Sequence, residues 1–186
     1  MPIGNDIVDR QKAASVSNWQ RKGYLDKLFL PKEQELILAD EDPELMVWLL
    51  WTMKEASYKA VNRINGIRSF APVNFYCHDL LREGSQITAI VSTETDTLFV
   101  KAEINAHLIY AEASLSKKIL ENLRVSFFEN AIDYVALFNS VCAGKILLKT
   151  ADGLPLVIDT VSGNALLASV SHHGRYTAIT YTGSQQ

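Results

Sequence analysis

A long uninterrupted helical segment most constrains how this chain folds. Asp42, Pro43 and Glu44 form a strong helix start, with a capping residue, a proline suited to the first turn and an acid near the positive end of the helix dipole. From Glu44 to about Ile64 the chain has good helix formers and neither proline nor glycine, and a glycine follows as a stop signal. Apolar residues cover much of the circumference in the first half of this segment. We therefore expect a central helix.

Segments rich in strand-forming residues lie on both sides of this helix. Residues 98–104 alternate apolar and polar side chains, as a half-buried strand does. Polar breaks separate the segments, and the second and third of those after the helix have the pattern of a hairpin. The predicted strands are Ile3–Val8, Val73–Leu80, Gln86–Thr93, Thr97–Asn105 and His107–Leu115.

The second part of the chain repeats this order. The pattern from Ser116 to about Ala143 is helical, and Gly144 is the stop signal. Short predicted strands then follow at Ile146–Lys149, Leu156–Ile158, Leu166–Val170 and Tyr176–Tyr181. A helix followed by a small antiparallel sheet, twice, predicts an α+β fold.

The composition excludes several classes of protein. The chain has 186 residues, enough for one domain or two small joined halves. Its 18 Lys+Arg and 21 Asp+Glu residues give a net charge of −3, which argues against general nucleic-acid binding. No apolar stretch is long enough to span a membrane. Cys77 and Cys142 cannot form a disulfide framework, so we expect reduced thiols in a cytoplasmic protein.

Three short segments contain the residues suited to chemistry. In the first, GNDIVD at residues 4–9, Asp6 lies within an otherwise apolar strand. A buried acid needs a partner, so Asp6 is either a metal ligand or a solvated acid on an edge strand.

The second segment, WTMKEASYKA at residues 51–60, lies on the predicted central helix. Glu55 and Lys59 are four residues apart and share one face, with Lys54 about a quarter-turn away. A solvated ion pair is the simple interpretation. The apolar surroundings instead favour an acid and a base within a site.

The third segment, SVSHHG at residues 169–174, has the features of an anion site. Ser171 and His172 point to opposite faces of a strand, so they do not form a catalytic dyad. A strand end before a glycine turn offers a hydroxyl, an imidazole and backbone N–H groups to a phosphate. The neighbouring histidines also face opposite ways, and we expect His173 at the surface.

Together and in this order, the three segments resemble motifs of the 4′-phosphopantetheinyl transferase superfamily. GNDIVD resembles its G-x-D-I-x-[E/D] motif, and WTMKEASYKA resembles W-x-x-K-E-A-x-x-K-A. DGLPLV at residues 152–157 and SVSHHGRYTAI at residues 169–179 resemble its G-K-P and S-x-S-H motifs.

This resemblance implies an activity and a metal. Members transfer the phosphopantetheine arm of coenzyme A to a serine of an acyl- or peptidyl-carrier protein and release adenosine 3′,5′-bisphosphate. By position, Asp6 and Glu55 would be Mg²⁺ ligands, with pyrophosphate oxygens and water completing the shell. Glu55, or a water that it orients, would take the serine proton.

The resemblance also implies contacts with coenzyme A. Lys59 would meet the phosphate charge, and Lys54 would contribute nearby. Ser171 and His172 would contact the cofactor phosphates.

Two departures from the family pattern stand out. Val8 occupies the position of a third carboxylate in the longer, two-lobed branch, so water would fill that place, as in the short holo-acyl-carrier-protein synthase branch. Leu154 replaces the lysine of G-K-P, which removes one cation expected for the cofactor 3′-phosphate. Lys149 or Lys145 is a candidate substitute.

The order of the motifs bears on assembly. It follows the short branch, whose members build the site between protomers of a trimer, but here an insertion of about residues 72–143 precedes the last motifs. The chain resembles a circularly permuted two-lobed enzyme, with one lobe at about residues 1–115 and the other at about 116–186, each with a small antiparallel sheet and a long helix. Termini that lie close together tolerate permutation. We therefore favour a monomer over a trimer.

The carrier surface and the alternatives remain open at this point. Arg21, Lys22 and Lys27 lie in the region that faces the acidic carrier in the family, although a solvated basic face is the slightly favoured interpretation. A catalytically weak member that only binds carriers, motivated by Val8 and Leu154, is the main alternative to a transferase. An enzyme that uses another nucleotide is a third possibility.

Overall fold

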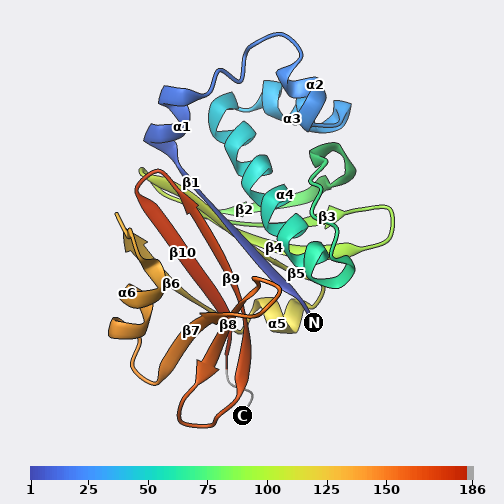
Figure 1. Ribbon diagram of the computed structural model, residues 1–186. Helices are drawn as coiled ribbons and strands as arrows, with labels where there is room; N and C mark the ends of the chain where they lie inside the picture. Colours follow the sequence, from blue (N-terminus) through green and yellow to red (C-terminus); the bar gives the residue numbers. More distant parts are fainter. Residues whose placement is uncertain (184–186) are drawn as a thin grey trace.

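Two five-stranded antiparallel sheets form the core of the computed structural model, which describes residues 1–183 (Figure 1). The strands of the first sheet are β1 (Ile3–Asp9), β2 (Tyr76–Glu83), β3 (Gln86–Ser92), β4 (Thr97–Ile104) and β5 (Leu108–Ser114). Those of the second are β6 (Leu123–Glu129), β7 (Lys145–Lys149), β8 (Pro155–Asp159), β9 (Ala165–His173) and β10 (Tyr176–Thr182). The mixed α+β fold predicted from the sequence is confirmed.

The two sheets share one topology. The strand order is β1-β5-β4-β3-β2 in the first sheet and β6-β10-β9-β8-β7 in the second. In each sheet the first strand forms an edge and pairs with the last, while the other strands form a meander. The predicted hairpin is β3 and β4, paired from Ser92 opposite Thr97 to Gln86 opposite Glu103. The repeated helix-and-sheet order of the sequence thus becomes a repeated topology.

The central helix has the predicted boundaries. α4 (Pro43–Asn65) begins where the Asp42 carboxylate accepts a hydrogen bond from Leu45 N at 3.0 Å, and it ends at Gly66, whose φ of 68° is left-handed. It packs on the first sheet, mainly against β1 and β5. The smaller helices of this part are α1 (Arg10–Val16), α2 (Tyr24–Leu28), α3 (Pro31–Ala39) and η1 (Pro72–Asn74), of which α3 and η1 contact α4.

The prediction of a helix from Ser116 to about Ala143 is wrong. This region contains α5 (Lys117–Leu120), strand β6 and α6 (Tyr134–Val141). β6 pairs with β10 from Leu123 opposite Thr182 to Glu129 opposite Tyr176. Val125, Phe127 and Phe128 favour a strand once such a partner is present, and the partner lies about fifty residues away in sequence. The helix of the second sheet is therefore the eight-residue α6 rather than a long one.

β1 is the element that joins the two sheets. On one side it pairs with β5, and on the other it lies against β9 and β10 of the second sheet. Ile7 packs there in a buried cluster with Tyr110, Tyr176 and Ala178. The first sheet and α4 share a larger core, and the second sheet and α6 a smaller one.

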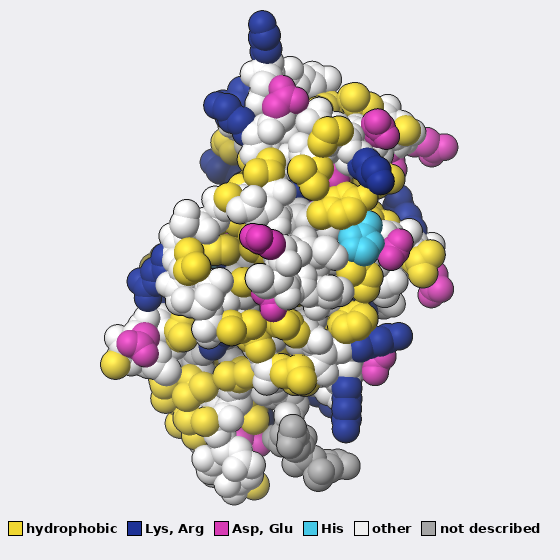
Figure 2. Space-filling model, turned by 90° about the vertical axis from the view of Figure 1, so that its right-hand side faces the viewer, with side chains coloured by type: hydrophobic (Ala, Val, Ile, Leu, Met, Phe, Trp, Pro, Cys, Tyr) yellow, Lys and Arg dark blue, Asp and Glu magenta, His cyan; other side chains and the backbone are white. Residues whose placement is uncertain are grey.

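The surface shows mixed charge. On the face in Figure 2, the described Lys and Arg side chains and the Asp and Glu side chains are dispersed rather than gathered in one patch. Within residues 1–183, no helix has both the length and the apolar character needed to cross a membrane.

Gly4 sets the close packing of α4 on β1. A Cβ atom at this position would lie 2.6 Å from the backbone nitrogen of Ala60 and would also collide with the carbonyl oxygen of Ala56. Both obstacles are helix backbone, which cannot move aside as a flexible side chain does. Only glycine therefore permits this approach.

We predict that Gly4→Ala destabilises the protein by roughly 3 kcal/mol or more, because α4 must separate from β1. Gly66→Ala is the comparison: its Cβ meets open space, so only the left-handed φ of 68° costs about 1 kcal/mol. Urea unfolding measures both. Equal losses in the two variants would contradict the packing argument.

Candidate active site

The free edge of β1 organises the site. Because β1 pairs only with β5, the N–H groups of alternate residues point away from the first sheet. Asn5 N donates to Ser169 Oγ at 3.1 Å, and Asp9 N donates to His173 Nδ1 at 2.9 Å. Between them, the backbone N–H of Ile7 hydrogen-bonds to the Asp6 carboxylate. At Asn5 and Asp9, the second sheet therefore completes this edge with side chains instead of a strand.

Asp6 and Lys59 form an ion pair beside this edge. Lys59 Nζ lies 2.8 Å from Asp6 Oδ1 and also donates to the carbonyl oxygen of Asn5 at 2.9 Å. The Asp6 side chain is 13% exposed and that of Lys59 is 28% exposed. Burial raises the pKa of Asp6, and the ammonium of Lys59 opposes that rise. A second oxygen of Asp6 has no ion-pair partner among the described residues.

Glu55 lies one helical turn before Lys59 and shares its electrostatic environment. Burial is the largest cause that raises its pKa to about 7, and the negative charge of Asp6 adds to the rise. Lys59 again opposes it. The structure thus brings together three of the residues predicted from the sequence, Asp6, Glu55 and Lys59. Within residues 1–183, no group of three or more His, Cys, Asp and Glu side chains is arranged to hold a metal.

The third motif is placed differently from the sequence expectation. Ser171 is buried, and its Oγ accepts a hydrogen bond from Asn5 Nδ2 at 3.1 Å. His172 is exposed on the opposite face of β9. His173, expected at the surface, is partly buried against β1 and interacts electrostatically with Asp6. The strand extends through His173, so alternation puts Ser169, Ser171 and His173 on the β1 side.

Lys54 is not part of this group. Its side chain is fully buried and lies 2.6 Å from Glu33 Oε2. It also donates to the carbonyl oxygens of Leu28 at 2.9 Å and Pro72 at 3.1 Å. These bonds use the three ammonium hydrogens. The structure therefore places Lys54 between α4 and the small helices, where its ammonium is fully paired.

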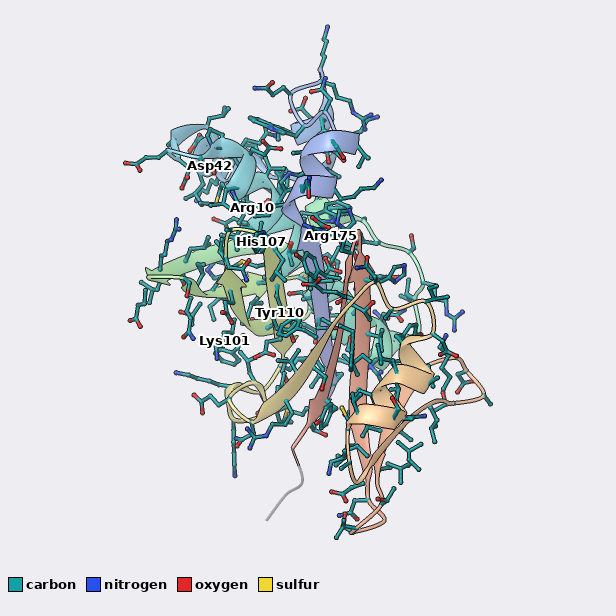
Figure 3. All side chains as sticks on the ribbon, turned by 90° about the vertical axis from the view of Figure 1, so that its left-hand side faces the viewer. Arg10, Asp42, Lys101, His107, Tyr110 and Arg175 are labelled. Atoms are coloured by element: carbon teal, nitrogen blue, oxygen red, sulfur yellow. The ribbon has the colours of Figure 1, made fainter. Side chains whose placement is uncertain are left out.

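Sequence reasoning missed two residues that fix the site. Asn5 is buried, and its Nδ2 also donates to the carbonyl oxygen of Ala178 at 3.1 Å. Asp9 accepts from Arg175 Nε at 3.0 Å and from the Arg175 backbone at 3.1 Å, and these bonds lower its pKa to about 2. Figure 3 shows Arg175 at the tip of the β9 and β10 hairpin, beside the start of α1 at Arg10. Asn5 and Asp9 are polar residues within the otherwise apolar GNDIVD segment, and this pattern could have identified both.

The loop around Leu154 has arginines beside it. Lys145 pairs with Asp159 at 3.2 Å, and Lys149 lies 5.7 Å from the ring centre of Tyr134. Arg68 Nη2 instead donates to the carbonyl oxygen of Asp152 at 2.8 Å. Arg63 Nη2 donates to the carbonyl oxygens of Pro155, at 3.0 Å, and Ala168.

We predict that Glu55 makes stability fall as the pH rises. Its pKa is 4.5 ordinarily and about 7 in the folded protein, so between these values the folded state binds more protons than the unfolded state. The free energy of unfolding therefore decreases from about pH 4.5 to about pH 7. Glu55→Gln lacks this decrease and is more stable than the wild type at pH 8 by roughly 1–2 kcal/mol, allowing for solvent screening.

Urea unfolding across this pH range in buffer with a metal chelator measures the effect. Parallel stability curves for the wild type and Glu55→Gln would contradict it.

The comparison with known families agrees with this arrangement. The profile of the 4′-phosphopantetheinyl transferase superfamily matches residues 2–117, more than half of the chain. The matched range contains the first sheet and α4, with Asp6, Glu55 and Lys59, whereas β9 lies outside it. No curated protein matches the sequence. The resemblance inferred from the motifs is confirmed: the chain belongs to the 4′-phosphopantetheinyl transferase superfamily.

Proposed function

We propose that this protein transfers the 4′-phosphopantetheine group of coenzyme A to a serine of an apo acyl- or peptidyl-carrier protein, as a holo-acyl-carrier-protein synthase does. The reaction depends on Mg²⁺ and releases adenosine 3′,5′-bisphosphate. The convergence of Asp6, Glu55 and Lys59 at the free edge of β1, within the range that matches the superfamily, is the observation that supports it.

The residues present fit a magnesium ion. Asp6 and Glu55 both offer carboxylate oxygens, and the negative charge of Asp6 raises the pKa of Glu55. A cation between them would relieve this repulsion. A hard ion that keeps several waters needs only one or two carboxylates from the protein. When bound there, Mg²⁺ would neutralise pyrophosphate charge and stabilise the leaving phosphate.

The protein side chains supply charge and a proton acceptor. Lys59 provides an ammonium beside Asp6 that offsets the phosphate charge. The carrier serine oxygen forms a bond to the phosphorus that carries the pantetheine arm, and the bond from this phosphorus to the bridging oxygen breaks. The serine proton goes to a Glu55 carboxylate oxygen. A pKa near 7 lets Glu55 accept and release that proton at neutral pH.

We assign the role of the missing G-K-P lysine to Arg68. Lys145 and Lys149 have partners elsewhere, whereas Arg68 is exposed beside the loop that contains Leu154. Lys59 and Arg63 lie on α4, and Arg68 lies just beyond its C-terminal end. The successive phosphates of one coenzyme A molecule could therefore meet successive cations. Arg63 is held by two carbonyl oxygens, which leaves Arg68 as the more available donor.

The arrangement also supports a monomer. β9, with the S-x-S-H motif, completes the edge of β1 within the same chain, where the short branch of the family uses a neighbouring protomer. The carrier surface that we propose is the groove of about 380 Å³ beside α2 and α3, whose lining includes Trp19, Arg21 and Lys22. Its basic and aromatic side chains suit an acidic helical partner.

Transfer is tested by incubating the protein with coenzyme A, Mg²⁺ and a set of apo-carrier proteins, then weighing the carriers by mass spectrometry. A phosphopantetheine adduct on a serine supports the proposal. Complex formation without an adduct would support the carrier-binding module instead.

We predict that Glu55→Gln lowers the transfer rate by at least roughly 100-fold, because the proton acceptor and a metal ligand are lost. Circular dichroism should show an unchanged fold. Glu44→Gln, in the first turn of the same helix, is the matched control and keeps the wild-type rate. A wild-type rate in Glu55→Gln would refute the assignment.

We predict that Arg68→Gln raises KM for coenzyme A by roughly 10-fold and leaves KM for 3′-dephospho-coenzyme A unchanged, because only the former carries the 3′-phosphate. Arg82→Gln, which removes another exposed arginine bonded to a loop carbonyl oxygen, should change neither value. Equal effects of Arg68→Gln on both substrates would contradict the assignment.

A further inference from the structure

The two neighbouring histidines of β9 have different surroundings. His172 lies on the face of the second sheet that carries Ala168 and Val170, where α6 packs, and it is exposed. His173 lies on the opposite face, partly buried against the free edge of β1. His173 is close enough to Asp6 for the two side chains to influence each other's pKa.

The backbone fixes the tautomer of His173. Its Nδ1 accepts the hydrogen bond from Asp9 N at 2.9 Å, so this nitrogen carries no proton. The proton of the neutral ring is therefore on Nε2. Burial lowers the pKa of His173, which favours the neutral ring.

The same bond directs Nε2–H. The two nitrogens lie on different sides of the imidazole ring, so a ring whose Nδ1 faces Asp9 N directs Nε2–H away from the backbone of β1. Within residues 1–183, Nε2 has no hydrogen-bond partner. A donor with a fixed tautomer, next to an ion pair of a carboxylate and an ammonium, suits an oxyanion.

We propose that His173, through Nε2–H, binds a phosphate oxygen of coenzyme A beside Asp6, and that His172 does not have this role. The inference rests on the proposed function, because it takes coenzyme A as the anion. Lys59 supplies the charge, while His173 supplies a directed hydrogen bond that orients the phosphate. The family motif alone predicts that His172 contacts the phosphate. Because side chains alternate along β9, His173 is the histidine on the β1 side, and we therefore assign the contact to His173.

Two substitutions separate the two nitrogens of His173. His173→Asn places an amide oxygen near the position of Nδ1, so it keeps the acceptor for Asp9 N but loses the Nε2 donor. His173→Gln places its amide nitrogen near the position of Nε2, so it keeps the donor but loses the acceptor. His172→Asn is the matched control on the other face of the strand.

Calorimetry measures Kd for coenzyme A and for inorganic pyrophosphate, with Mg²⁺ and again with a chelator, and thermal unfolding measures stability. We expect His173→Asn to weaken coenzyme A binding by roughly 10- to 100-fold, the loss of a hydrogen bond to a charged group, with little change in Tm. His173→Gln should bind within a few-fold of the wild type but unfold at a lower temperature. His172→Asn should match the wild type in both measurements.

The inference is overturned if His173→Asn binds like the wild type, which would leave His173 as a structural cap of β1. It is also overturned if His172→Asn shows the larger loss of affinity. A wild type that binds coenzyme A without modifying any carrier refutes the proposed transfer, while the comparison of the histidines still stands on Kd. A wild type that binds neither probe refutes both.

Discussion

The free edge of β1 is the constraint on which the rest of this structure depends. An edge strand in the middle of a protein leaves backbone N–H groups that must find partners, because a buried unsatisfied donor is costly. Here Ser169, the Asp6 carboxylate and His173 are those partners. The bonds to Ser169 and His173 also hold the second sheet against the first, with Asp6 between the two points of attachment. Structure and site therefore share one set of contacts.

A second set of contacts holds α4 over this edge. Gly4 lets the helix backbone approach β1, and the buried pair of Lys54 and Glu33 attaches the other side of α4 to the small helices. Glu33 also accepts from Cys77 N at 2.8 Å, so the pair reaches β2. A buried ammonium with three oxygen partners resists rotation of the helix, since each alternative leaves a charge unpaired. Glu55 follows Lys54 directly, and its position depends on that restraint.

The electrostatics of the site follow from this packing. Burial raises the pKa values of Asp6 and Glu55, the charge of Asp6 raises that of Glu55 further, and Lys59 offsets only part of each rise. Two carboxylates in such surroundings favour a cation or a proton, as the proposed magnesium binding and proton transfer require. At the other end of β1, Arg175 in the turn between β9 and β10 donates hydrogen bonds to Asp9, the residue that caps α1. These bonds attach the hairpin of β9 and β10 to the start of α1. The cluster is thus held from both sheets.

The sequence by itself determined the boundaries of α4 and the shared face of Glu55 and Lys59, because capping residues and a four-residue helical spacing are local. The grouping of Asp6 with them followed from the resemblance to the family. The two-fold order of helix and strands was also readable, and the family followed from the motifs. Tertiary structure decided that residues 123–129 form a strand, that Lys54 is buried with Glu33, and that His173 rather than His172 faces the free edge of β1. Each of these depends on partners far away in the sequence, whose positions no local pattern contains. A strand pairs, and a charge finds its counterion, only once the two sheets have met along the edge of β1.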